Sequence, residues 1–400
     1  MRGLSGWCVA ACLAATQPAF AKGDAVPALP TYTAAYEPQG VDERGLWMEV
    51  DEVERAMRDS KAIITDPKLN QYVRDVVCRT VGEDRCRTVR VYIVRDASFN
   101  ASMFPNGMML VHTGLLLRAR DEAEMASVLG HEFAHFELRH SLNGFKQRRT
   151  ATDIFAWAGV AAAGAYQHGG PGAYQTVRTA QAVQAGAVRS IYSHSREQER
   201  QADLLSMAYL RKSPYDPHCF SRVWTRLMDE ADATAHGRRQ RSTRYDRVSF
   251  FSTHPTQLER ASYLRDIADG MNKTGDDEAE RYRTALESWR PQLLADQIKL
   301  NDFEGTDYLL TGLAGERWTG PLLFARGELY RTRGHPRDLV SAVAFYRDAI
   351  AQDATNADAY RGMGLAQLRS RDPQAAGTLK KYLAMKPDAS DSAMISTLLQ

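Results

Sequence analysis

A His-Glu-x-x-His pattern at residues 131–135 constrains this chain more than any other feature. Residues four positions apart lie one above the other on an α-helix, so the imidazoles of His131 and His135 can bind one tetrahedral zinc ion. Glu132 lies close enough to accept a proton from the water that completes the coordination. The surroundings favour a helix, because Asp121 is a candidate N-cap and an apolar stripe follows at helical spacing: Met125, Val128, Leu129, Phe133 and Phe136.

A third ligand is expected from residues 195–203. Glu199 and Asp203 are four positions apart, so both carboxylates face the same way on a second helix. Glu199 can complete a His₂Glu site and leave the fourth position for water. Asp203 can accept the free ring N–H of a ligand histidine and can pass a proton during the reaction. Glu197 is rotated by about 200° from Glu199 and is expected to point elsewhere. A charged, solvated helix face is the alternative.

His140 is not expected to bind the metal. It follows His135 by five residues, which rotates it off the ligand face of a continuous helix. Metzincins place a glycine and a third histidine at positions occupied here by Leu138 and Ser141, so that class is excluded. We therefore expect His140 to be a structural or a surface residue.

Four ordered motifs resemble the HtpX-like and CAAX-prenyl-protease-type zinc metallopeptidases. They are the His-Glu-x-x-His segment, residues 195–203, residues 100–116, and Ser252-Thr253-His254-Pro255 followed by Arg260. The resemblance covers roughly residues 46–269 and implies one zinc ion per chain, held by His131, His135 and Glu199. Gln201 departs from the family, many members of which carry glutamate there, but this position is not a ligand.

His254 has two roles open to it within this resemblance. It can donate a hydrogen bond to the oxyanion as a catalytic residue, or it can occupy the fourth zinc position and hold the enzyme inactive. A structural role before Pro255 is the third reading.

The resemblance is strongest to the soluble periplasmic members of Gram-negative bacteria, in which tetratricopeptide repeats follow the peptidase. Residues 1–21 have the character of a signal peptide, with a basic start, an apolar stretch and Ala19-Phe20-Ala21 as the cleavage site. We therefore expect a periplasmic protein with an extended arm over residues 22–45. Lipidation at Cys12 is the alternative.

No transmembrane helix is expected. The longest charge-free run, residues 154–177, is interrupted by glycine and proline, and its first part is shorter than the roughly 20 residues of a membrane span. Residues 154–165 are expected to form a buried or membrane-surface helix, which leaves peripheral membrane contact open. The net charge of +2 implies no nucleic-acid partner. The arginine-rich residues 238–247 suit a solvated loop, a lid or a site for acidic lipid head groups.

Three cysteines remain after removal of the signal peptide. In an oxidising compartment, the spacing of Cys78 and Cys86 suits a local disulfide between a helix and the strand expected over residues 89–94. Two buried thiols are the alternative. Cys219 is expected to be free and buried.

The sequence changes character after residue 270, where helical periodicity replaces strand signals. Two segments match tetratricopeptide positions, and their glycines, Gly327 and Gly364, recur near the 34-residue period; the other matching residues are Leu323, Tyr330, Ala342, Tyr346 and Ala349, then Tyr360, Ala376 and Leu383. Such repeats stack into a concave binding surface. A chance helical hairpin is the alternative.

These features together predict an α+β, mostly helical protein. A gluzincin-type metallopeptidase domain with a small sheet is expected over residues 46–270, and an all-α tetratricopeptide-like domain over residues 271–400. If the strand at residues 108–112 lies at the sheet edge, it can pair with an extended peptide. We expect a zinc endopeptidase that cleaves unfolded or misfolded envelope proteins and contacts the outer-membrane assembly machinery through its repeats. A chaperone or adaptor with latent proteolysis is the alternative.

Overall fold

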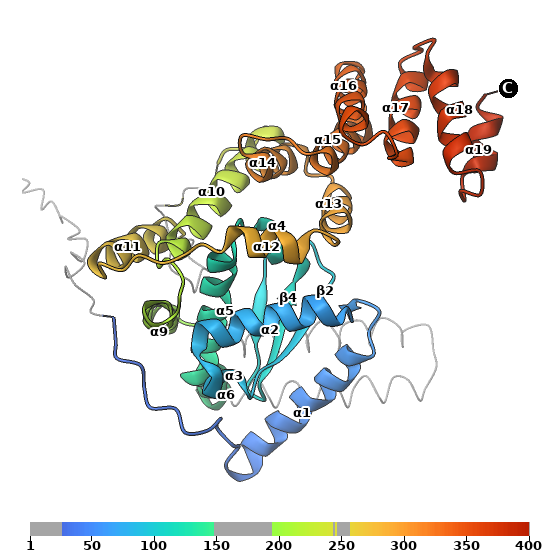
Figure 1. Cartoon of the computed structure of the whole chain (residues 1–400). Helices are drawn as coiled ribbons and strands as arrows, with labels where there is room; N and C mark the ends of the chain where they lie inside the picture. The colour runs from blue at the N-terminus through green and yellow to red at the C-terminus, as the bar shows by residue number, and fades with distance from the viewer. Residues whose placement is uncertain (1–25, 148–193, 243–244, 246–256, 400) are drawn as a thin grey trace, which may run out of the picture.

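The computed structural model describes residues 26–147, 194–242, 245 and 257–399 (Figure 1). A small sheet surrounded by helices forms the N-terminal part, and a row of helices leads away from it to the C-terminus (Figure 1). The strands are β1 Ile63–Ile64, β2 Arg90–Val94, β3 Ala101–Met103 and β4 Met108–His112. The helices of the N-terminal part are α1 Gly40–Arg58, α2 Pro67–Val81, α3 Glu83–Cys86, α4 Thr113–Arg118, α5 Glu122–Glu137, α6 His140–Gln147, α9 Arg196–Lys212, α10 Cys219–Gly237 and α11 Gln257–Gly270. Those that follow are α12 Ala279–Leu286, α13 Arg290–Ile298, α14 Phe303–Ala314, α15 Gly320–Arg333, α16 Pro336–Gln352, α17 Ala357–Arg369, α18 Ala375–Met385 and α19 Ser392–Thr397.

The sheet is mixed, with strand order β1-β2-β4-β3. β2 and β4 pair in parallel, and β1 and β3 pair antiparallel at the two edges. Residues 108–112 form a strand as expected, but the condition for peptide pairing on it is not met, because β4 lies between β2 and β3. The edge strand beside β4 is β3, whose three residues are too few to show the alternating pattern that identifies a strand in a sequence.

Helix α5 lies at the centre of the N-terminal part and is buried along most of its length. Its start is fixed as predicted, because the Asp121 carboxylate accepts a hydrogen bond from the backbone N–H of Glu124. Gly130 lets α5 pack closely against two neighbours: a Cβ atom there would lie 3.0 Å from Oγ of Ser206 on α9 and 3.1 Å from Cγ2 of Thr80 on α2. This close packing places α5 directly against α9.

The predicted disulfide between Cys78 and Cys86 is confirmed, with 5.0 Å between the two Cα atoms. Cys219 is free and buried, as expected. Contrary to expectation, the bridge does not reach the strand, because Cys86 ends the short helix α3 and β2 begins only at Arg90. It therefore joins α2 to α3.

The N-terminal arm runs in extended conformation only as far as Gln39, because helix α1 begins at Gly40. Two arginines hold the arm against the body: Arg85 donates to the carbonyl of Pro30 at 2.5 Å, and Arg211 donates to the carbonyl of Pro27 at 2.9 Å. Residues 1–21, the expected signal peptide, and Cys12 lie outside the described residues, as do residues 154–165.

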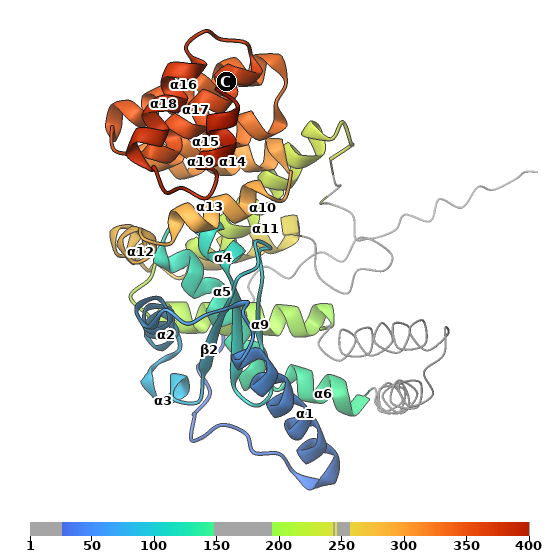
Figure 2. The same ribbon diagram turned by 90° about the vertical axis from the view of Figure 1, so that its right-hand side faces the viewer.

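The C-terminal helices pack as successive neighbours, α15 on α16, α16 on α17 and α17 on α18 (Figure 1). They lie together at one end of the molecule (Figure 2). Small residues sit where helices approach closely. A Cβ atom on Gly327 would lie 2.8 Å from the ring of Tyr346, and one on Gly364 would lie 2.6 Å from the Leu379 side chain. Gly362 contacts the same Tyr346 ring, so this tyrosine fills the space among α15, α16 and α17.

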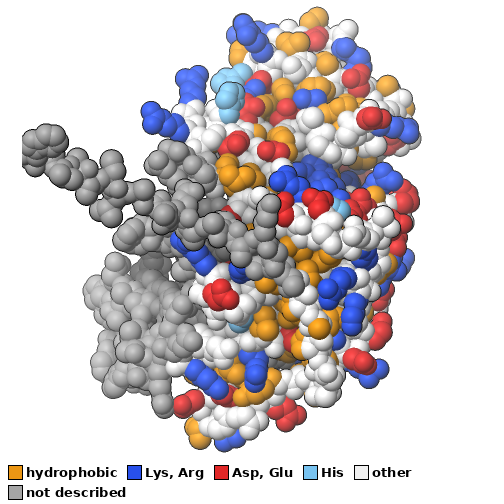
Figure 3. Space-filling model, turned by 90° about the vertical axis from the view of Figure 1, so that its left-hand side faces the viewer, with side chains coloured by type: hydrophobic (Ala, Val, Ile, Leu, Met, Phe, Trp, Pro, Cys, Tyr) orange, Lys and Arg blue, Asp and Glu red, His pale blue; other side chains and the backbone are white. Residues whose placement is uncertain are grey.

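Among the described residues, no helix combines the length and the apolar character that a bilayer crossing requires. The face shown in Figure 3 mixes basic and acidic side chains, with Lys and Arg side chains concentrated between the helical C-terminal part and the rest of the molecule. Acidic side chains lie beside this concentration, so that part of the face does not carry charge of a single sign.

Candidate metal centre and active site

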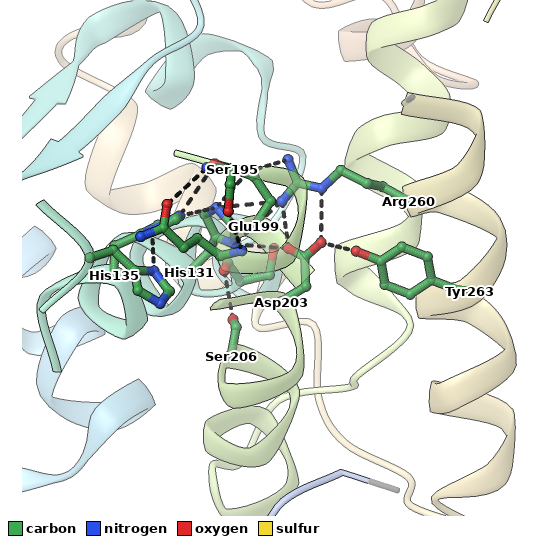
Figure 4. Close-up of polar contacts among 11 residues, drawn as sticks. His131, His135, Ser195, Glu199, Asp203, Ser206, Arg260 and Tyr263 are labelled. Carbon is green, nitrogen blue, oxygen red and sulfur yellow. Dashed lines mark hydrogen bonds and ion pairs between the residues drawn. The ribbon is translucent and has the colours of Figure 1, made fainter. Parts of the chain in front are cut away.

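The structure brings His131, His135 and Glu199 together from α5 and α9 (Figure 4). The two Nε2 atoms of the histidines are 3.1 Å apart, and each lies 3.6 Å from a carboxylate oxygen of Glu199. All three side chains are buried. Zinc ligands at about 2.0–2.2 Å in a tetrahedron are separated from one another by roughly 3.3–3.5 Å. The donor types and their spacing therefore fit one zinc ion, although their role as ligands stays a prediction.

The start of α9 fixes where Glu199 lies. Ser195 accepts a hydrogen bond from the backbone of Gln198, whose side chain accepts one from the backbone of Ser195. This capping box satisfies two N–H groups at the helix start and places Glu199 in the first turn. Further along α9, Ser206 donates to the carbonyl of Ser127 on α5, so the two helices are joined below the candidate ligands.

Asp203 lies behind His131, as the spacing predicted. Its Oδ1 is 2.8 Å from Nδ1 of His131. Arg260 on α11 binds the same carboxylate through two nitrogens, at 2.5 Å and 2.9 Å, and the Tyr263 hydroxyl donates to its Oδ2 (Figure 4). The Arg260 guanidinium stacks on the Trp224 ring at 3.9 Å. Asp203 is therefore paired on every side and stays charged, because its pKa is lowered by Arg260 and His131 in spite of burial.

The electrostatics of the site favour a cation between the ligand atoms. Burial lowers the pKa of His131, but the Asp203 carboxylate outweighs it and raises the pKa to about 9. Burial and the neighbouring His131 and His194 hold the pKa of His135 well below its usual value. His135 is thus a neutral imidazole with a lone pair to offer, while Glu199 and Asp203 supply negative charge.

Glu132 lies on α5 and is partly buried. It is not one of the three candidate ligands. Burial raises the pKa of its carboxyl group to about 7, although His131 and a backbone hydrogen bond from Met103 both favour the charged form. Met103 is the last residue of edge strand β3. The proposed general base therefore lies beside β3, an edge strand of the sheet that the described residues form.

His140 does not lie on the surface; it is buried against His135, with 2.9 Å between their Nδ1 atoms. The rotation argument failed because α5 does not continue to His140. Leu138 closes the helix, Arg139 adopts a left-handed conformation with φ 56°, and a new helix begins at His140. This turn folds His140 back onto the turn of helix that carries His135.

Sequence reasoning also missed what Arg260, Tyr263 and Trp224 do. Arg260 was part of a recognised motif, but nothing near it in sequence shows that it pairs with Asp203. Glu197 points away from the candidate ligands, as expected, and accepts a hydrogen bond from Gln201 at 3.0 Å. His254 lies outside the described residues, so both of its expected roles stay predictions.

A helix that carries His-Glu-x-x-His and faces a glutamate on a second helix defines the zinc metallopeptidase class. The model of peptidase family M48 matches residues 64–268, which include every described residue of the site. The chain belongs to peptidase family M48.

Curated relatives agree with this assignment. The chain is 31% identical over 230 residues to a putative beta-barrel assembly-enhancing protease of Vibrio cholerae, which covers 56% of this chain and 45% of the relative. It is 25% identical over 219 residues to the beta-barrel assembly-enhancing protease of Escherichia coli K12. This match covers 54% of this chain and 42% of the relative. It is 32% identical over 183 residues to the metalloprotease YcaL of Escherichia coli K12. This match covers 45% of this chain and 62% of the relative. The chain thus spans less than half the length of the two assembly-enhancing proteases.

Proposed function

We propose that this protein is a periplasmic zinc endopeptidase that cleaves unfolded or misfolded envelope proteins. The observation that carries the proposal is the convergence of His131, His135 and Glu199, with Glu132 beside them on α5. The names of the relatives, which refer to β-barrel assembly, support an envelope substrate.

The chain's own residues divide the work of peptide hydrolysis. His131, His135 and Glu199 would hold the metal; zinc bound there supplies a Lewis acid and lowers the pKa of a coordinated water. Glu132 takes the proton of the attacking water and passes it to the leaving amine. Asp203 holds Nδ1 of His131, so that Nε2 keeps its lone pair.

The substrate would bind as an additional strand on β3. The backbone N–H of Phe104 donates to the carbonyl of Met108, and the N–H of His112 donates to the carbonyl of Asn100, so the backbone groups of the residues between them alternate in direction. Ala101 and Met103 therefore point their backbone groups away from β4, towards the free edge. An extended peptide paired there would run past Glu132, which already accepts a hydrogen bond from Met103.

The C-terminal helices would select the substrate or a partner in the outer-membrane assembly machinery. We propose that residues 271–400 form a tetratricopeptide-like domain and residues 46–270 the peptidase domain. The close contacts of Gly327 and Gly364 support this division, since small residues at those positions are typical of such repeats.

Substitution of Glu132 tests the proposed chemistry. Glu132→Gln keeps the side-chain size but removes the proton acceptor, so proteolysis of an unfolded outer-membrane protein should fall by roughly 10²–10⁴-fold while zinc content stays at one per chain. The matched control is Glu52→Gln on the exposed surface of α1, which should cleave at the wild-type rate. Wild-type cleavage by Glu132→Gln would remove Glu132 from this role. If the wild-type protein prevents aggregation without cleaving, the chaperone alternative holds.

A further inference from the structure

We propose that His140 and Gln201 form a positioning relay that fixes the tautomer of His135 and so keeps its Nε2 lone pair available to the metal. The inference rests on the proposed zinc site and extends it to residues with no assigned role. His140 and Gln201 are positioning residues, because neither of them lies among the three candidate ligands.

A continuous chain of hydrogen bonds runs from the start of α9 to His135. Nε2 of Gln201 donates to Oε1 of Glu197 at 3.0 Å. Oε1 of Gln201 lies 3.2 Å from Nε2 of His140, and Nδ1 of His140 lies 2.9 Å from Nδ1 of His135. The two histidine rings are buried, and the Glu197 end of the chain is exposed.

The direction of each bond follows from the carboxylate at one end. A carboxylate only accepts, so Gln201 must turn its NH₂ group to Glu197 and its oxygen to His140. An amide oxygen only accepts, so Nε2 of His140 must carry the proton and its Nδ1 must be unprotonated. His135 must then donate from Nδ1, which leaves a lone pair on Nε2, the atom that faces His131 and Glu199.

Packing holds the relay in place. Arg139 reverses the chain so that His140 approaches from a separate helix, α6, rather than from the turn that carries His135. The ring of His194 stacks on the ring of His135 with 3.9 Å between centroids and 19° between planes. Rotation of the His135 ring would break this stack and the bond to His140 together.

The two candidate ligand histidines are thus supported in chemically different ways. Nδ1 of His131 faces the carboxylate of Asp203, whereas Nδ1 of His135 faces a neutral imidazole backed by a neutral amide. A carboxylate partner raises the basicity of a ligand imidazole more than a neutral partner does. Gln201 therefore matters because it orients the relay without adding a third negative charge to Glu199 and Asp203.

A second metal ion bound by His135, His140 and His194 is the competing reading, since their ring nitrogens lie within 4.8 Å of one another. The 2.9 Å separation of the two Nδ1 atoms is a hydrogen-bond distance, and in the relay His135 is the donor, which leaves no lone pair on its Nδ1 for a second metal ion. The relay therefore predicts one metal ion per chain, and the competing reading predicts two.

Two measurements on the full chain test the relay. The first is the long-range ¹H–¹⁵N spectrum of ring-labelled histidine in chelator-treated protein, which distinguishes the two tautomers without any activity. The second is zinc affinity by competition with a chromophoric chelator.

Gln201→Leu should lose the single His135 tautomer and weaken zinc binding by about 10–100-fold. Gln201→Glu keeps an oxygen that can accept from Nε2 of His140, so it should retain both the single tautomer and the zinc affinity. Asn143→Ala, an exposed residue near His140 on α6, is the matched control and should change neither.

His140→Phe provides a second variant that removes the acceptor but keeps a ring, and it should weaken zinc binding as much as Gln201→Leu does. Unchanged zinc affinity and an unchanged tautomer in Gln201→Leu would overturn the relay, as would two bound metal ions in the wild type. The result that would refute the proposed peptidase function differs from the results that would refute the relay. A wild-type protein that shows the fixed tautomer but does not cleave would refute the peptidase proposal and leave the relay intact.

Discussion

Glu199 and Asp203 are one helical turn apart on α9, yet their surroundings give them different tasks. Asp203 is saturated by His131, Arg260 and Tyr263, so it has little capacity left for a metal. Glu199 instead turns its oxygens to the two Nε2 atoms. Between two carboxylates on the same helix face, the structure thus favours Glu199 as the ligand.

Removal of the Glu199 carboxylate should therefore remove the metal. We expect Glu199→Ala to bind zinc more than about 100-fold more weakly than the wild type, because a ligand matters at least as much as the groups that orient it. Elemental analysis after dialysis measures the loss, with Glu52→Ala on α1 as the control. Full zinc retention would move the third ligand elsewhere.

At the scale of the element, the Glu54 carboxylate is the centre of a hydrogen-bond network that joins helix α1 to the sheet. Glu54 accepts hydrogen bonds from Arg90 at 2.6 Å, from Tyr92 at 2.8 Å and from Asn106 at 2.7 Å. Its pKa is lowered, chiefly by the hydrogen bond from Arg90. Helix α1 is thus anchored by a charged group whose ionisation differs between the folded and the unfolded chain.

The sign of the pH dependence follows from that difference. Because the pKa of Glu54 is lower in the folded state, its stabilisation is complete at neutral pH and is lost as the pH falls below about 4.3. Glu54→Gln should lower the free energy of unfolding at pH 7 by about 1–3 kcal/mol, towards the lower end since Arg90 is half exposed. Urea unfolding should show this difference shrinking as the pH falls towards 4. A difference that is constant with pH would contradict the assignment.

The bridge between α2 and α3 acts at the same scale. A disulfide over the eight-residue separation of Cys78 and Cys86 is worth about 2–3 kcal/mol. The double variant Cys78→Ser, Cys86→Ser should lose that much stability in urea unfolding, and a reductant should lower the wild type to the same level. The reductant should leave the double variant unchanged, which serves as the control. Equal stability of the oxidised wild type and the variant would show that the bridge does not stabilise the fold.

At the scale of the whole molecule, the metal should join two helices that packing already brings together. A ligand that binds only the folded chain adds RT ln(1 + [L]/Kd), about 2.7 kcal/mol at a hundredfold excess over Kd. The midpoint of thermal unfolding should thus rise with zinc concentration in the wild type. Glu199→Ala should show no such rise, and an equal rise in both proteins would mean that zinc binds outside this site.

Local features were predictable because they depend on residues close in sequence. The cap at Asp121, the face shared by Glu199 and Asp203, and the Cys78–Cys86 bridge each follow from spacing alone. The edge position of β3 was not predictable, since three residues carry no periodicity. His140 is buried, which fits the structural role left open for it, but its contact with His135 was not predictable because one left-handed residue, Arg139, invalidates helical counting beyond it.

Contacts between segments that are far apart in the sequence were also not predictable. The pairing of Arg260 with Asp203 joins α11 to α9, and the stacking of Arg260 on Trp224 adds α10. The motif that contains Arg260 predicted that the residue belongs to the site. Only the folded arrangement indicates which carboxylate it neutralises.

The separation of the candidate ligands along the chain has a consequence in polymer terms. His135 and Glu199 are about 60 residues apart, and closing a loop of that length in the unfolded chain costs roughly 4 kcal/mol of chain entropy. Doubling the segment would add only about 0.6 kcal/mol. The entropy of closing this separation therefore depends only weakly on its length, whereas one residue inserted between His131 and His135 would rotate an imidazole off the ligand face. A one-residue change of length within α5 should therefore cost the site far more than a one-residue change of chain length between α6 and His194.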